Sequence, residues 1–315
     1  MLYRIVRLTL ICGLAFAGIT ALVGQTRTDS DLQGVWLSNS ATPLERPRAL
    51  EGRAHLTDEE VAELQRRSTR LLQDGSNDFE AGDNAFLAAL NNVQHYESPT
   101  STDRNWAMVP RDFDNRTSLI TGPPDGKLPP LTQEAQNKRA RAAATRHPVQ
   151  GPEDLNSAER CLTFGVPRLG GNFGAGPYSY YQIIQAPGYV VFFMEAIHEV
   201  RIIPLYGRAH MPQGVRTWAG DSVGRWEGQT LVIDTTNLPL SNAFMGAGPN
   251  LHLIEKFTRV TADRLNYEVT VDDPDTWTSP WTAMIILKRS NDKMFEFACH
   301  EENVTTMKGM LQGGR

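Results

Sequence analysis

The segment EAIHEVR places two carboxylates, an imidazole and a guanidinium inside an otherwise apolar run, YVVFFMEAIHEVRIIPL. Burial in apolar surroundings raises the pKa of a carboxyl group toward neutrality, where the group can act as a general acid or base. A neighbouring guanidinium would stabilise negative charge that develops on a substrate. The sequence therefore predicts acid–base chemistry here, with Glu195 or His198 moving the proton and Arg201 stabilising the charge.

Structural roles compete with this interpretation. Glu199 and Arg201 are two residues apart and could neutralise each other, and a buried histidine often only satisfies hydrogen bonds. If residues 189–205 form one strand, His198 lies on one face, while Glu195, Glu199 and Arg201 lie on the other. Both faces are mostly apolar, which predicts a barrel wall covered outside by a helical arm. Which face lines the cavity stays open.

A further carboxylate is expected to point inward from the segment LHLIEKFTR. The alternation in this segment and in RLNYEVTVDD predicts a hairpin that pairs Phe257 with Tyr267 across a five-residue loop, 260–264. Glu255 then faces the interior, where a carboxylate needs a partner or a purpose. The predicted catalytic set is Glu195, His198, Arg201 and Glu255.

Two loops supply candidate substrate contacts. The stretch YGRAHMPQGVRTWAGDSVGRWEGQTLVIDTTN contains His210 and Asp221, and DDPDTWTSPWT contains Trp277 and Trp281. The indoles could form a platform for a ring-shaped ligand, although a rigid turn with packed indoles and a calcium loop are alternatives. Histidines 198, 210, 252 and 300 lack HExxH, HxH or CxxC spacing, so we predict neither a metal nor a cofactor.

The hydrophobic period changes to two after residue 175, with short turns between segments. About eight consecutive strands without intervening helices predict an antiparallel meander that forms a barrel or a strongly curved sheet. One more strand is expected at LQGVWLS. The other strands are expected near 179–186, 189–205, 215–226, 229–237, 251–260, 265–272, 281–289 and 294–300.

The segment before residue 160 is polar and partly helical. LTDEEVAELQRRSTRLLQ predicts a helix with Thr57 as N-cap, Glu60 completing a capping box, and Leu56 packing on Val61. Further helices are expected within NAFLAALNNVQ and, after Thr132, within TQEAQNKRARAAATR. This region predicts an irregular arm on the barrel.

The N-terminal sequence predicts that the protein is exported from the cytoplasm. Arg4 and Arg7 precede an apolar run from Leu8 to Val23, so residues 1–24 resemble a secretory signal peptide. Two cysteines, Cys161 and Cys299, then remain for an oxidising compartment, and we predict a disulfide between them, with two buried thiols as the alternative. A periplasmic or secreted protein is expected.

Charge excludes some partners. The chain has 31 basic and 36 acidic residues; without Arg4 and Arg7 the balance is 29 against 36, about −7, which disfavours nucleic acid and anionic membrane surfaces. No later segment is long and apolar enough for a membrane span. The expected organisation is a signal peptide over 1–24, a first strand plus arm over 25–160, and the barrel or curved sheet over 161–315.

The sequence shows two resemblances to known families. The tripeptide GVW at 34–36 looks like the G-x-W signature of lipocalins, which implies a barrel around a small molecule. The motifs RTSLITGPPDGKLPPLT, ERCLTFGVPR, EAIHEVRIIPLYGRAH, GDSVGRWEGQTLVIDTTN, EKFTRV, YEVTVDDPDTWTSPWT and FEFACHE resemble a large family of secreted bacterial proteins of unassigned function, over most of residues 30–315. That kinship implies no reaction and no catalytic residues. A simple lipocalin also lacks an arm like 40–160.

The sequence therefore predicts a mainly β protein with a lipocalin-like barrel or curved sheet and a partly helical N-terminal arm. Its predicted function is cofactor-independent isomerisation or elimination, as an isomerase or lyase, on a small apolar or cyclic molecule in the cavity. A non-catalytic carrier with the same cavity is one alternative, and a structural interaction module of the envelope is another. Fold alone does not decide among them.

Overall fold

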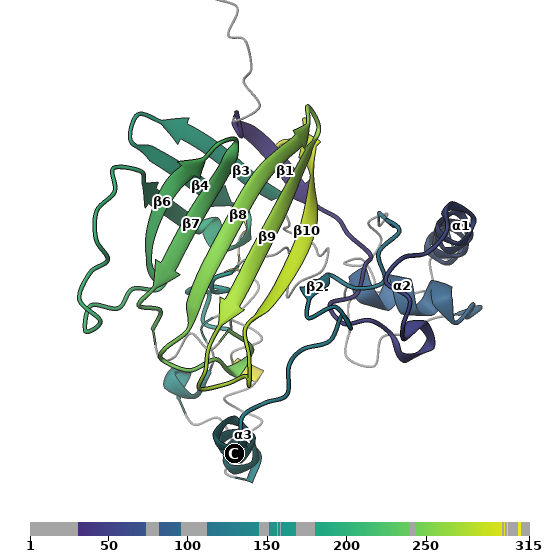
Figure 1. Ribbon diagram of the computed structural model, residues 1–315, viewed down its shortest axis with the longest axis horizontal. Helices are drawn as coiled ribbons and strands as arrows, with labels where there is room; N and C mark the ends of the chain where they lie inside the picture. The colour runs from purple at the N-terminus through teal and green to yellow at the C-terminus, as the bar shows by residue number, and fades with distance from the viewer. Residues whose placement is uncertain are drawn as a thin grey trace, which may run out of the picture.

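The strands form one curved antiparallel sheet that nearly closes into a barrel (Figure 1). This computed structural model describes residues 31–73, 82–95, 112–144, 151–155, 157, 159–167, 180–239, 244–297, 299, 301 and 308–309. The mainly β fold expected from the sequence is confirmed. The strands are β1 Gly34–Ser38, β2 Ile120–Gly122, β3 Tyr180–Ala186, β4 Tyr189–Met194, β5 Val200–Pro204, β6 Asp221–Glu227, β7 Thr230–Thr236, β8 His252–Thr261, β9 Arg264–Asp272 and β10 Trp281–Ser290.

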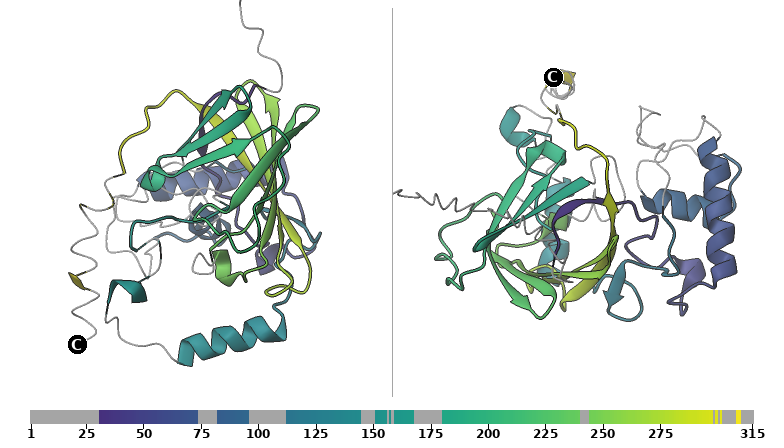
Figure 2. Two further views of the ribbon diagram at one scale, coloured as in Figure 1. Left: turned by 90° about the vertical axis from the view of Figure 1, so that its left-hand side faces the viewer. Right: turned by 90° about the horizontal axis from the view of Figure 1, so that it is seen from above.

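Strand order explains the closure. The sheet runs β5-β4-β3-β1-β10-β9-β8-β7-β6, and the short β2 also pairs with β10. The expected meander is present from β3 to β5 and from β6 to β10, while β1 joins the two halves by pairing with both β3 and β10. Seen from above, the strands surround a common axis (Figure 2, right). The two edges of the sheet are therefore β5 and β6.

The helices are α1 Asp58–Gln73, α2 Gly82–Leu90 and α3 Gln133–Ala144. The predicted capping box starts α1: the Thr57 N–H donates to Glu60 Oε2 at 2.8 Å, and the Glu60 N–H donates to Thr57 Oγ1 at 3.3 Å. The Ala135 N–H likewise donates to Thr132 Oγ1 at the start of α3. Short 3-10 turns cover Arg48–Leu50, Pro152–Asp154, Ala196–His198 and Phe244–Gly246.

The helices α1 and α2 have an apolar cluster of their own, which includes Leu56, Leu64 and Phe86. They lie beside β2 and β10, whereas α3 lies below the barrel (Figure 1). Among the described residues, these helices do not cover the outer face of 189–205, where Ile202 is 61% exposed. None of the described helices is both long and apolar enough to cross a bilayer. The predicted signal peptide, 1–24, lies outside the described residues.

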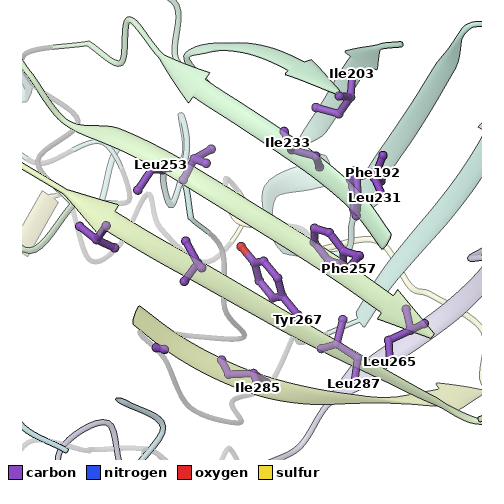
Figure 3. Close-up of a cluster of buried hydrophobic side chains, with 14 of the residues drawn as sticks. Phe192, Ile203, Leu231, Ile233, Leu253, Phe257, Leu265, Tyr267, Ile285 and Leu287 are labelled. Carbon is purple, nitrogen blue, oxygen red and sulfur yellow. The ribbon is translucent and has the colours of Figure 1, made fainter. Parts of the chain in front are cut away.

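Inward-facing side chains from both halves of the sheet meet in one apolar core (Figure 3). The predicted β8–β9 register is confirmed: Phe257 pairs with Tyr267, and their rings stack at 4.3 Å between centroids. The connecting loop is shorter than the five residues expected, because the register shifts after Arg259 and lets Thr261 pair with Arg264.

Tryptophans fill both ends of the barrel. At one end Trp36 donates from Nε1 to the Leu32 carbonyl at 2.8 Å, and the guanidinium carbons of Arg259 and Arg289 lie 6.0 and 5.6 Å from its ring centroid. The strand β10 runs from that end to the opposite one, where Trp281 is buried. The polar groups of the barrel interior therefore lie between Trp36 at one end and Trp281 at the other.

The segment 189–205, expected as one strand, is a hairpin. β4 ends at Met194, a tight turn follows over Ala196–His198, and β5 begins at Val200. The Met194 N–H donates to the Glu199 carbonyl at 2.9 Å and closes the turn. Ile197 and His198 have φ of 55° and 52°, a conformation that residues other than glycine seldom adopt. Because the turn reverses the chain, the predicted assignment of faces is wrong.

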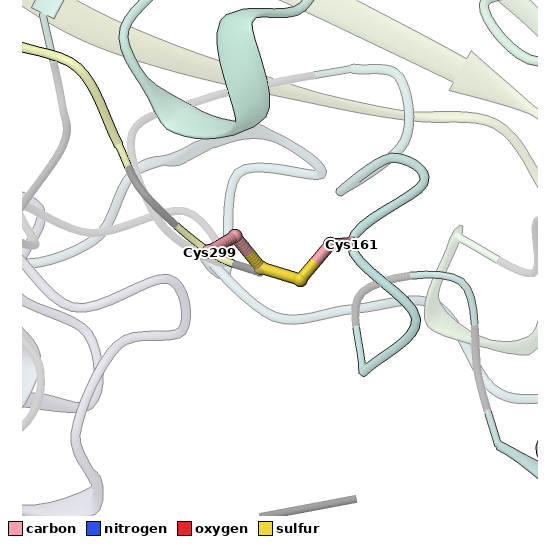
Figure 4. The surroundings of a disulfide bond; sticks show 2 residues. All are labelled: Cys161 and Cys299. Carbon is pink, nitrogen blue, oxygen red and sulfur yellow. A yellow bond between two sulfur atoms is a disulfide. The ribbon is translucent and has the colours of Figure 1, made fainter. Parts of the chain in front are cut away.

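Two other strand predictions need correction. Of the expected strand 215–226, only residues 221–226 belong to a strand, β6, and residues 294–297 of the expected strand 294–300 form no strand. β10 already pairs with β1 on one side and with β9 on the other. A strand that follows β10 in the chain therefore finds no free edge of β10 to pair with. The predicted disulfide is confirmed: Cys161 and Cys299 are bonded, with Cα atoms 6.0 Å apart (Figure 4).

Candidate functional site

The hairpin turns Arg201 into the barrel, opposite Phe192 on β4. There it meets Glu255 of β8 and Tyr267 of β9, and we call these three residues the interior triad. Arg201 donates from Nη1 to Glu255 Oε1 at 3.1 Å and from Nη2 to Oε2 at 2.6 Å. Tyr267 donates from Oη to Glu255 Oε1 at 2.5 Å. The side chain of Glu255 is 0% exposed and that of Arg201 is 5% exposed, so the pair is fully desolvated.

Two hydroxyls extend this network across the sheet. Arg201 Nη2 lies 3.2 Å from Ser222 Oγ on β6 and 3.3 Å from Thr235 Oγ1 on β7, and the two hydroxyl oxygens are 2.9 Å apart. Arg201 thus links β5 to β6, β7 and β8. Within the part of the chain that the structure describes, its Nε has no hydrogen-bond partner.

Two members of the interior triad, Tyr267 and Arg201, keep one protonation state around neutral pH. Burial, and then the charge of Glu255, raise the pKa of Tyr267 well above its ordinary value. Burial alone would lower the pKa of Arg201, but the charge and hydrogen bonds of Glu255 outweigh it and raise that pKa. The phenol therefore stays neutral and the guanidinium stays charged, so neither exchanges protons at neutral pH.

A narrow cavity adjoins the interior triad. It is large enough for about one ordered water molecule. Apart from the triad and the ring of Tyr181, its walls are apolar. The lining residues are Tyr181, Ile183, Phe192, Met194, Arg201, Glu255, Phe257, Tyr267 and Leu287.

The structure divides the predicted catalytic set. Arg201 and Glu255 come together at the cavity, whereas Glu195 and His198 belong to the turn that connects β4 to β5 and do not line it. Glu195 Oε1 accepts the Phe295 N–H at 2.9 Å. Glu199, for which pairing with Arg201 was one alternative, accepts a hydrogen bond from Thr163 Oγ1 at 2.7 Å.

Three members of the site were not predicted from the sequence: Tyr267, Ser222 and Thr235. A signal for Tyr267 was present, because the predicted register already placed it on the face of Glu255, one pair further along the hairpin. Ser222 and Thr235 had no comparable signal, since their role depends on how β5 approaches β6 in space.

His210 and Asp221 come together, but on the outer face of the sheet. His210 Nδ1 lies 2.9 Å from Asp221 Oδ2, and His210 Nε2 lies 3.1 Å from Asp234 Oδ1, which also contacts His252 Nε2 at 2.8 Å. Arg208 adds an ion pair to Asp221. We call these five residues the outer cluster. It ties the loop 205–220 to β6, β7 and β8.

Asp221 is the most strongly held carboxylate of the outer cluster. Burial alone would raise its pKa, but hydrogen bonds from Arg208, from the Met211 N–H and from His210 outweigh burial and lower the pKa to about 2. The Met211 N–H donates to Asp221 Oδ2 at 2.8 Å. This carboxylate therefore stays ionised at neutral pH and acts as an anchor for the loop.

Trp277 and Trp281 lie in the apolar core, 2% and 1% exposed, and neither lines the cavity. Their rings meet edge to face with centroids 5.6 Å apart, and Phe244 stacks on Trp281. Asp273 of the same loop accepts the Gly248 N–H at 2.6 Å. The described residues contain no group of three or more His, Cys, Asp or Glu side chains that could hold a metal ion.

Comparisons with known proteins identify no family. No protein-family model matches the chain, and no curated protein matches it. Among solved structures, the chain is similar to a "secretary abundant heat soluble (SAHS) protein" from Ramazzottius varieornatus, at 12% sequence identity and a TM-score of 0.25. The match covers 35% of this chain and 70% of that chain. At these values the likeness carries no argument about activity.

Proposed function

We propose that the protein binds a small, mainly apolar molecule inside the barrel, with the polar end of that molecule at the interior triad. One observation carries the proposal: a cavity with apolar walls adjoins a buried ion pair in the centre of an apolar barrel. Small-molecule sites commonly combine apolar walls with a few fixed polar groups.

Stability alone does not account for the ion pair. Desolvating two charges is expensive, and apolar side chains of similar volume often stabilise a core as well or better. Apart from Tyr267 and the hydroxyls of Ser222 and Thr235, apolar and aromatic side chains surround Arg201 and Glu255. A polar centre next to a void is therefore better explained by recognition of a ligand than by packing.

The charges of the interior triad define the ligand class. Arg201 and Glu255 balance each other, and Glu255 would repel a carboxylate or phosphate placed beside it. Among the described residues Arg201 Nε has no partner, and this donor calls for a hydrogen-bond acceptor. We therefore expect a neutral ligand that carries a carbonyl, ether or hydroxyl oxygen on an apolar body.

Binding must widen the cavity, because the space now holds about one water. Met194 and Phe192 line one side of it, and a methionine side chain adapts readily to ligands of different shape. We expect the ligand to displace the water and to move these two side chains.

The first test uses prodan, a neutral fluorescent ketone, as the probe. We expect saturable binding with a blue-shifted emission, and Leu287→Phe, which adds bulk to the cavity wall, should weaken binding by about tenfold or more. The matched control is Leu253→Phe, which overpacks the same core at a residue that does not line the cavity. Absence of saturable binding, or equal weakening in both variants, would refute the proposal.

The acid–base enzyme predicted from the sequence has less support. Glu195 and His198 lie outside the cavity lining, and Tyr267 and Arg201 keep fixed protonation states near neutral pH. General acid–base catalysis needs a group whose pKa lies near the working pH. Isomerisation or elimination in this cavity therefore stays a prediction that turnover assays must test.

We also propose that binding takes place in the periplasm or outside the cell. The bond between Cys161 and Cys299 supports an oxidising compartment, because disulfides are rare in reducing cytosol. Fractionation of the native host with an antibody against the protein tests this; recovery in the cytosolic fraction alone would contradict it.

A further inference from the structure

One wall of the barrel is built differently from the rest. Neighbouring strands from β5 around the sheet to β6 share antiparallel backbone ladders. The two edge strands, β5 and β6, are both fully described, yet they share no ladder, although they approach each other closely. We call the contact between them the seam.

Side chains alone hold the seam on its inner side. Arg201 Nη2 donates across it to Ser222 Oγ at 3.2 Å. Further along, Ile203 and Leu205 press against Gly224, where an added Cβ would lie 2.8 Å from a methyl carbon of each. The missing side chain of Gly224 is therefore what lets the two edges approach.

The other routes into the cavity are better closed. Trp36 and Trp281, each at most 1% exposed, fill the two ends of the barrel. Parting β8 from β9 would break a ladder that extends from His252 to Arg264. Parting the seam breaks no backbone ladder, only the hydrogen bonds from Arg201 to Ser222 and Thr235 and a set of apolar contacts, so it is the wall with the lowest resistance to opening.

The β4–β5 hairpin is exposed on its outer side, while hydrogen bonds from Thr163 and the Phe295 N–H hold its turn. Val200 and Ile202 are 48% and 61% exposed there. The Leu205 N–H bonds to the Gly188 carbonyl, so Leu205 belongs to the hairpin, whereas Arg208 is fixed to β6 through Asp221. The connection between these two anchors includes Gly207, whose φ is 69°. This places a hinge at residues 206–207.

We propose that the cavity is entered sideways, through the seam, by movement of the β4–β5 hairpin away from β6. Arg201 is the latch, because it lines the cavity and also forms the polar contact across the seam. Opening separates Arg201 from Ser222, while the bidentate pair with Glu255 supplies the contact that draws the hairpin back. The inference rests on the proposed function for its purpose, but its test needs no ligand.

The test measures how fast a thiol in the cavity reacts. Met194→Cys places the thiol on the cavity wall, in a full chain that also carries Cys12→Ser, and methyl methanethiosulfonate is the reagent. The seam is locked by a disulfide between Ile203→Cys and Gly224→Cys; the first substitution removes one of the methyl groups that crowd position 224. The matched control lock joins Thr230→Cys to Thr258→Cys, whose hydroxyls lie 2.8 Å apart on β7 and β8.

We expect the seam lock to slow labelling of the cavity thiol by about tenfold or more, and the control lock to leave the rate unchanged. Equal rates in the two locked proteins, or no labelling in the unlocked one, would overturn the proposal. Ser222→Ala supplies a second measurement that needs no engineered disulfide: loss of the latch contact should accelerate labelling by roughly threefold or more. An unchanged rate in that variant would also count against the seam. Prodan binding to the unlocked protein separately tests the proposed function.

Discussion

Arg201 and Glu255 depend on each other for their burial. Each lies in a mainly apolar core, and each satisfies the charge of the other through two hydrogen bonds. Tyr267 adds a third donor to the same carboxylate. Removing one member of such a pair leaves an uncompensated charge in the core. Replacing both members with apolar side chains leaves no charge, and only the fit of the new side chains in the core changes.

Glu255→Gln should therefore lower the free energy of unfolding by roughly 3–5 kcal/mol. The double variant Arg201→Met/Glu255→Met should lose less than the sum of the two single changes, because no unpaired charge remains. Urea unfolding of the unsubstituted protein, Arg201→Met, Glu255→Met and the double variant checks this as a double-mutant cycle, and Glu255→Gln is measured beside them. Additive losses would show that the two side chains do not stabilise each other.

The turn between β4 and β5 decides which residues reach the cavity. The alternation expected for one strand over 189–205 places Arg201 on the same face as Glu195. Because the chain reverses at 196–198, Arg201 instead pairs with Phe192. The turn contains no glycine, proline or asparagine, so neither composition nor hydrophobic period marks it. By contrast, the β8–β9 register and the inward position of Glu255 were predictable from strict alternation.

His198→Gly should stabilise the protein by roughly 0.5–1 kcal/mol, because glycine adopts positive φ without the steric penalty that other residues meet. The control is His198→Ala, which removes the same exposed imidazole but keeps the penalty. Thermal unfolding of the three proteins measures the difference. If alanine and glycine behave alike, the turn is not strained at this residue.

The loop 205–220 should be sensitive to acid through Asp221. The pKa of Asp221 is lowered from 3.8 to about 2 in the folded protein. The stabilising contribution of this carboxylate is therefore fully present above about pH 4 and is lost as the pH falls toward 2. Between pH 5 and pH 2.5 we expect Asp221→Asn to lose less stability than the unsubstituted protein, as measured by urea unfolding. Asp263→Asn, at an exposed site, should lose as much as the unsubstituted protein. Parallel losses in all three would contradict the anchoring role.

The covalent closure of the molecule was predictable at the scale of the whole chain, since Cys161 and Cys299 form an even pair after the predicted signal peptide is removed. Their separation of 138 residues encloses every strand from β3 to β10. The near closure of the barrel was predictable only in outline. The insertion of β1 between β3 and β10 depends on pairing between distant segments, which local patterns do not encode.

Replacing both cysteines, Cys161→Ser/Cys299→Ser, should lower stability by roughly 3–5 kcal/mol, because a cross-link over a long loop restricts the unfolded chain. Chemical unfolding without reductant measures the loss. The control is the unsubstituted protein unfolded with reductant, which should approach the same stability. A variant as stable as the oxidised protein would show that the bond contributes nothing.

The contact between the two sheet edges, β5 and β6, also limits aggregation of the protein through exposed strand edges. An exposed edge strand offers unpaired N–H and C=O groups to any neighbouring chain, and apolar side chains on its outer face strengthen such contacts. Here β5 carries Val200 and Ile202 outward, and β6 shields its inner side. Each opening of the seam uncovers two strand edges at once. Resistance to aggregation in concentrated solution is therefore set by how briefly the barrel stays open.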